Sequence, residues 1–76
     1  MPVRGARLHR TADRVDRVKL RYRSRPLLCR VAGEPKAGAH ATLQLDLAEP
    51  VDGAAPGQLA CLMDGDLVVG WGTIAR

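Results

Sequence analysis

Hydrophobic and polar residues alternate along short stretches of the chain, and this alternation predicts β-strands. In residues 17–24 cationic side chains take the odd positions, while Val18, Leu20 and Tyr22 take even ones. In residues 42–47 leucine occupies every second position. Because successive side chains of a strand point to opposite faces, each stretch predicts a strand with one buried face. The predicted strands cover residues 17–24, 27–31, 42–47, 59–63 and 67–74.

Two stretches do not show a simple alternation of hydrophobic and polar residues. Residues 6–15 carry apolar positions near helical spacing, which offers a helical alternative, and this segment is left open as a short strand or a frayed turn. In the strand predicted at 59–63, Leu59, Cys61 and Met63 share one face, and we expect that face to be buried.

Three glycines occur in the last twelve residues of the chain, Gly65, Gly70 and Gly72. Asp64-Gly65-Asp66 lies between two apolar runs, and a tight hairpin needs a residue with positive φ at such a place. Gly70 and Gly72 lie inside the last predicted strand, where glycine is typical of a bulge or a sharp bend. Five to six short strands without a long helix predict an all-β fold, a small antiparallel β-barrel that leaves no edge strand exposed.

The chain is short and poor in aromatic residues. It has 76 residues, no Phe, and only Tyr22 and Trp71 as aromatic side chains. One domain with a thin aliphatic core is expected, because a chain of this size buries only about 60% of its unfolded surface. No run approaches the ~18 apolar residues of a membrane span, and the N-terminus lacks the apolar region of a secretory signal. We therefore expect a cytoplasmic protein without membrane contact.

No motif for catalysis, metal or cofactor is found. The glycines near the end lack the third glycine and following helix of a dinucleotide-binding loop, and no EF-hand glutamate follows the Asp-Gly-Asp turn. Cys29 and Cys61 stand far apart and without histidine at ligand spacing. They are interpreted as a reduced pair buried on strands. The sequence thus predicts no cofactor, no metal and no catalytic residue.

Positive charge is concentrated in the first third of the chain. Residues 1–25 carry nine Lys or Arg against two Asp, a net charge of +7, whereas residues 26–76 have a net charge of −3. This asymmetry favours a polyanionic partner for one face.

Five of the cations fall on one face of the strand predicted from residue 17. Alternate strand residues recur every ~6.6 Å, so the five form a stripe about 26 Å long that can follow phosphates. The alternatives are a solvated face, partly paired with acids such as Asp46 or Asp52, or contact with a protein. The predicted RNA-binding residues are Arg17, Lys19, Arg21, Arg23 and Arg25.

The two aromatic residues have different expected roles. Strand alternation turns Tyr22 away from its flanking arginines and towards the face of Val18 and Leu20, so we expect it in the core. Trp71, beside two glycines, is a candidate stacking platform, a partner anchor, or a lid over one end of the barrel. Of these three roles, the lid is favoured.

Two segments resemble the C-terminal β-barrel of bacterial tRNA-specific 2-thiouridylases. They are KLRYRSRPLLCRV at 19–31 and EPVDGAAPGQLACLMDGDLVVGWGTI at 49–74. The matching residues are Lys19, Arg21, Tyr22, Arg23, Cys29, Glu49, Pro50, Pro56, Gly57, Gln58, Asp64, Gly65, Asp66, Gly70, Gly72 and Ile74.

The chain also departs from that family. The resemblance implies ATP-dependent thiolation of a tRNA wobble uridine, yet the family's SGGxDS loop is not in this sequence. The family's catalytic cysteines belong to the domain that carries that loop, so Cys29 inherits no catalytic role. Trp71 stands where the family has the middle glycine of a triplet.

Together these observations predict a basic segment at 1–16 that leads into a β-barrel domain at 17–76. The expected function is that of a non-catalytic barrel of a tRNA thiolation system, with tRNA and a separate thiouridylase-like catalytic protein as partners. The alternative is a protein-docking barrel for a truncated thiouridylase-like sulfurtransferase that acts on a small molecule. A third reading is a structural remnant without independent activity.

Overall fold

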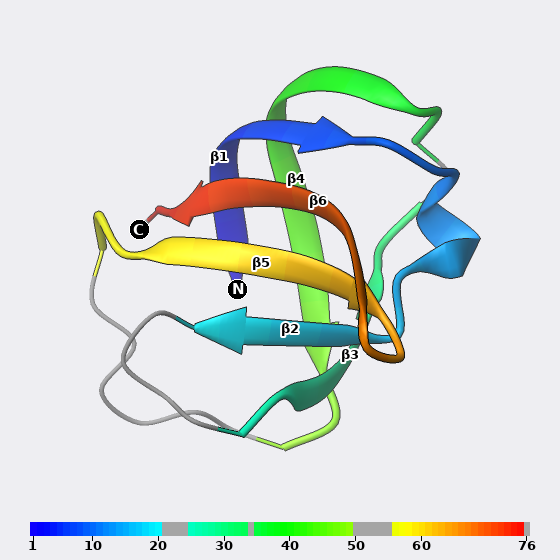
Figure 1. Cartoon of the computed structure of the whole chain (residues 1–76). Helices are drawn as coiled ribbons and strands as arrows, with labels where there is room; N and C mark the ends of the chain where they lie inside the picture. The colour runs from blue at the N-terminus through cyan, green and yellow to red at the C-terminus, as the bar shows by residue number, and fades with distance from the viewer. Residues whose placement is uncertain (21–24, 34, 50–55, 76) are drawn as a thin grey trace.

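The structure is a computed structural model that describes residues 1–20, 25–33, 35–49 and 56–75. Six antiparallel strands close into one barrel in the order β1-β4-β3-β2-β5-β6 (Figure 1). The strands are β1 (Pro2–Leu8), β2 (Arg17–Leu20), β3 (Leu27–Val31), β4 (Gly38–Leu47), β5 (Leu59–Asp64) and β6 (Leu67–Ile74), and one 3₁₀ turn, η1, covers Ala12–Arg14. The predicted all-β barrel is confirmed.

The barrel includes a strand, β1, that lies within the stretch 1–16 expected to lead into it. This strand pairs with β4 on one side and with β6 on the other, so the barrel starts at Pro2. Its burial does not alternate, because a register shift against β6 falls around Gly5, which has a φ of +56°. Such a bulge adds one residue to a strand and changes the face of the residues after it. Val3 and Ala6 are both buried as a result.

The core is aliphatic and follows the predicted alternation in β2 and β4. Val18, Leu20, Leu43 and Leu45 are at most 5% exposed, whereas the residues between them are exposed. Among the described residues no polar or charged side chain is buried. The predicted core residue Tyr22 lies outside the described residues.

The buried face of β5 was predicted wrongly. Ala60 and Leu62 are fully buried, while Leu59 is 44% exposed and Cys61 is half-buried. The register explains this, because Ala60 lies opposite Leu20 and Leu62 opposite Val18, both of which point into the core. Met63, next to a register shift between β5 and β6, is buried as well.

The last two strands form the predicted hairpin. Asp64 pairs with Leu67, and Gly65 between them has a φ of +58°. The backbone N–H of Gly65 donates to Oδ1 of Asp16 at 2.9 Å, which ties the turn to the start of β2.

The two glycines inside β6, Gly70 and Gly72, have a different role. A Cβ at Gly70 would lie 2.6 Å from the carbonyl oxygen of Arg7, and one at Gly72 would collide with the Val3 side chain. Both glycines therefore let β1 approach β6 closely.

Candidate nucleic-acid interface

Strand β2 presents the first two cations of the predicted stripe to solvent. Arg17 and Lys19 are exposed, and they alternate with Val18 and Leu20, which are buried in the core. Arg17 lies opposite Met63 and Lys19 opposite Cys61 on the neighbouring strand β5. Because the buried neighbours fix the phase of the strand, both cationic side chains point outward on the same face.

Arg25 lies close to the start of this stripe, on the far side of the β2–β3 connection. It is exposed, and together with Arg17 it lines a groove of about 440 Å³ that also includes Leu28 and Glu49. The other two predicted residues, Arg21 and Arg23, lie outside the described residues. The structure thus brings Arg17 and Arg25 to one groove and Arg17 and Lys19 to one strand face.

Acidic side chains form ion pairs with only some of the cations near β2. Within the described ranges, two ion pairs occur: Nε of Arg17 lies 3.6 Å from Oδ1 of Asp16, and Nε of Arg14 lies 3.0 Å from Oδ2 of Asp64. Asp46 pairs in register with Arg30 of β3 and not with the stripe, and Asp52 lies outside the described residues. Exposed pairs of this kind contribute little free energy, so Arg17 keeps its ability to exchange Asp16 for a phosphate.

Trp71 lies on the outer wall of the barrel in the middle of β6. Its Cα partners are Arg7 on β1 and Cys61 on β5, and 42% of the residue is exposed. The ring of His9, just after β1, lies against the indole with a centroid distance of 4.8 Å and a tilt of 57°. This position is on the wall, between two neighbouring strands, and not over an end of the barrel.

Two cations on the strand beside β6 were not singled out in the sequence. Arg7 and Arg4 are exposed on β1, and this strand closes the barrel next to β6. Arg7 lies opposite Trp71 and Arg4 opposite Thr73. The excess of positive charge in residues 1–25 was a signal for them, but only the strand order shows which face they share.

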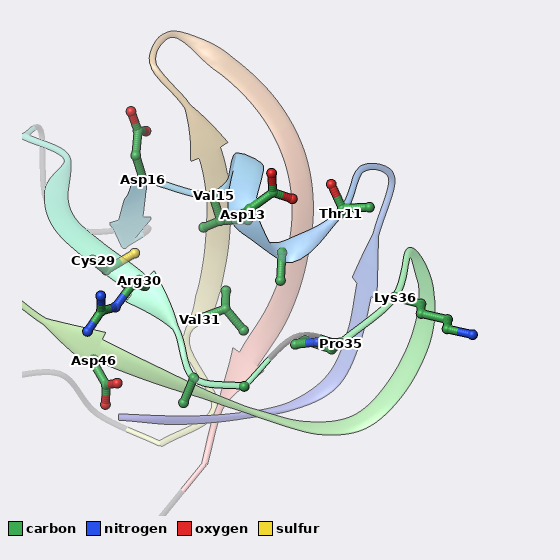
Figure 2. A pocket seen from close by; sticks show the side chains of 13 residues that line it. Thr11, Asp13, Val15, Asp16, Cys29, Arg30, Val31, Pro35, Lys36 and Asp46 are labelled. Atoms are coloured by element: carbon green, nitrogen blue, oxygen red, sulfur yellow. The ribbon is translucent and has the colours of Figure 1, made fainter.

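A second, larger groove opens at the barrel wall near η1. It has a volume of about 980 Å³ and is lined by η1, by β3 with the loop after it, and by Asp46 of β4 (Figure 2). Asp13, Asp16 and Asp46 line it together with Arg30 and Lys36, so the lining has mixed charge. Within the described residues, no three His, Cys, Asp or Glu side chains are placed to hold a metal ion.

The thiol of Cys29 also lines this groove. Burial, together with the negative charge of Asp16, raises the pKa of Cys29 to about 11. Because the thiolate is the reactive form, the thiol is a poor nucleophile at neutral pH. The raised pKa does not favour sulfur transfer at Cys29.

This pKa predicts slow alkylation of Cys29. In a Cys61→Ser variant, iodoacetamide at pH 8 should label native Cys29 about 100-fold more slowly than unfolded Cys29, because a rise of the pKa from 9.0 to about 11 lowers the thiolate fraction by about that factor. The native rate should rise about tenfold per pH unit up to a pH near 10. Mass spectrometry of timed samples measures both rates. Equal rates in the native and unfolded states would contradict the prediction.

No helix in the described part of the chain is long and apolar enough to cross a membrane.

Among models of protein families, one described as the aminomethyltransferase β-barrel domain matches residues 6–74. It represents a β-barrel domain of tRNA methyltransferase and thiouridylase-type proteins. Searches of curated proteins and of solved structures gave no match. The predicted resemblance is thereby confirmed at the level of this domain family.

Proposed function

We infer the function from one premise: this chain belongs to the aminomethyltransferase β-barrel domain family. We propose that it is a non-catalytic barrel module of a tRNA-modification system of the thiouridylase type, acting in the cytoplasm. In this role the barrel contacts tRNA phosphates and positions the RNA for a separate catalytic domain.

The observation that carries this proposal is the outward face of β2. Arg17 and Lys19 are exposed there while the alternate residues are buried, and alternate strand residues stand ~6.6 Å apart. Arg and Lys at such spacing form charge-assisted hydrogen bonds to successive phosphates. Arg25 extends the cationic surface across the groove that it shares with Arg17.

The described interior is consistent with a non-catalytic role. The described core consists of aliphatic side chains, and none of its members is titratable. The groove thiol, Cys29, has a pKa near 11 and is thus protonated under ordinary conditions. Chemistry on a nucleotide needs polar groups poised to transfer protons or to attack, and in this proposal they come from the separate catalytic domain.

A second candidate function is supported by a different surface. Leu67 and Val68, at the start of β6, are 58% and 51% exposed. Neighbouring exposed apolar residues favour contact with a protein, as in a docking barrel for a truncated thiouridylase-like sulfurtransferase. The RNA role has priority because cations occupy the outer faces of both β1 and β2.

Binding to tRNA at increasing salt tests the proposed function. If three to five phosphates are engaged, log K should fall against log salt with a slope of roughly −2 to −4.5, since each contact contributes about 0.7–0.9. Fluorescence anisotropy of labelled tRNA between 50 mM and 400 mM KCl measures the slope. Absence of binding at the lowest salt would overturn the RNA role. Salt-insensitive binding to a sulfurtransferase domain would favour the docking barrel instead.

A further inference from the structure

The direction of the Trp71 side chain is fixed by its two neighbours. Gly70 and Gly72 are both buried, and a Cβ at either position would meet β1, at the Arg7 carbonyl or the Val3 side chain. Strand alternation then leaves only the outward direction for residue 71. The indole is 42% exposed on this outer wall.

His9 packs against the indole. Its backbone N–H donates to the carbonyl oxygen of Val69 at 2.7 Å, which anchors His9 to β6 beyond the end of β1. Its ring lies 4.8 Å from the indole at a tilt of 57°, within the range of attractive aromatic pairs. An aromatic side chain that is already ordered loses less conformational entropy when a ligand stacks on it.

Cations lie on both sides of the indole. The register places Arg7, Trp71, Cys61 and Lys19 in one row across β1, β6, β5 and β2. Because adjacent strands are about 4.8 Å apart, the Cα of Arg7 lies one strand from Trp71 and that of Lys19 two strands away. Arg7 and Lys19 are exposed, and in the described part of the chain neither forms an ion pair.

We propose that Trp71 stacks with an unpaired base of the bound RNA, while Arg7 and Lys19 contact phosphates of the adjoining nucleotides. This inference rests on the proposed RNA contact and adds the class of RNA: a loop or single strand, since a base within a duplex keeps its faces covered. Aromatic platforms inside a cationic groove are the general means of binding single strands. The positive charge on both sides of the indole favours this ligand over an apolar protein surface.

The fluorescence of Trp71 tests the stack directly, because it is the only tryptophan of the chain. The two probes are an octamer of uridine and a blunt RNA duplex of eight base pairs. Stacking should quench the emission when the octamer binds, whereas the duplex should bind through its phosphates without quenching. Equal quenching by both RNAs, or none by either, would overturn the stack.

Variants separate the stack from the phosphate contacts. Trp71→Ala should weaken binding of the uridine octamer about 5- to 160-fold, the usual cost of losing one stacked base, and leave the salt slope unchanged. Trp71→Phe keeps an aromatic ring and should retain most of the affinity. Because residue 71 points away from the core, both variants should fold, which circular dichroism verifies. Trp71→Ala should unfold at a somewhat lower temperature, because more than half of the indole is covered and it packs against His9.

The outcomes distinguish this inference from the proposed function. If Trp71→Ala binds the octamer as well as the unmodified protein, and the salt slope stays steep, the stack is overturned and the phosphate contacts stand. If the unmodified protein binds neither the octamer nor tRNA at low salt, both are overturned. A loss of affinity that Phe restores, at unchanged slope, is the result we expect.

Discussion

The Leu62→Ala variant is expected to lose about 3–5 kcal/mol of its free energy of unfolding. Leu62 is fully buried and lies opposite Val18 on β2 and Gly70 on β6. Truncation of a buried leucine costs 2–5 kcal/mol, and the cost rises with the cavity that remains. The cavity persists here because Gly70 has no side chain that could fill it. A domain of this size has only about 4–11 kcal/mol of stability in total.

Leu67→Ala is the matched control for this change. It removes the same atoms five residues further along the same hairpin, at a position that is 58% exposed, so its effect should stay within about 0.5 kcal/mol. Urea unfolding of both variants, followed by circular dichroism, measures the difference. Similar losses in the two variants would contradict the burial of β5 as the structure describes it.

The packing of Leu62 also bears on the proposed RNA contact. Strand β5 lies between β2 and β6, and it holds Lys19 and Trp71 in one row through Cys61. Weaker packing of Leu62 therefore affects more than stability, because it loosens the strand that sets the spacing between a cation and the indole. Strands that are packed rigidly keep a fixed distance between residues that are far apart in sequence, so that these residues can act on one ligand.

The sequence predicted strands well wherever the two faces of a strand differ in polarity. In β2 and β4 cations or polar residues alternate with Val and Leu, and the structure has the predicted phase. In β5 the run Leu59–Met63 is apolar at every position, so the pattern holds no information about phase. The partners across the sheet decide it, and they bury Ala60 and Leu62.

The first strand could not be assigned from the sequence for another reason. A one-residue bulge at Gly5 interrupts the alternation of β1, and only pairing with β4 and β6 identifies it as a strand. For the same reason Arg7 and His9 could not be placed beside Trp71, because their proximity depends on contacts across more than sixty positions of the chain. Arg17 and Lys19 could be predicted, since local alternation alone orients them.

The double change Arg17→Gln/Lys19→Gln is expected to weaken tRNA binding about 25- to 60-fold at 0.1 M salt. Both side chains are exposed, so the fold should be retained. If each contacts one phosphate, its loss lowers the magnitude of the log–log slope by about 0.7–0.9, or about 1.4–1.8 for the pair. The free energy from counterion release vanishes at 1 M salt. At 0.1 M, one decade lower, a slope difference of about 1.4–1.8 therefore corresponds to an affinity about 25- to 60-fold weaker.

Lys36→Gln provides the control for net charge in this experiment. Lys36 is exposed in the loop between β3 and β4 and lines the groove near η1. The Lys36→Gln variant therefore removes one positive charge at a place away from the outer face of β2. A charge that acts only through the overall field should change the rate of association more than the salt slope. We therefore expect the slope of Lys36→Gln to equal that of the unmodified protein, and Lys19→Gln alone to lower it by about 0.7–0.9. Equal slopes for Lys19→Gln and Lys36→Gln would show that β2 is not the surface that holds phosphates.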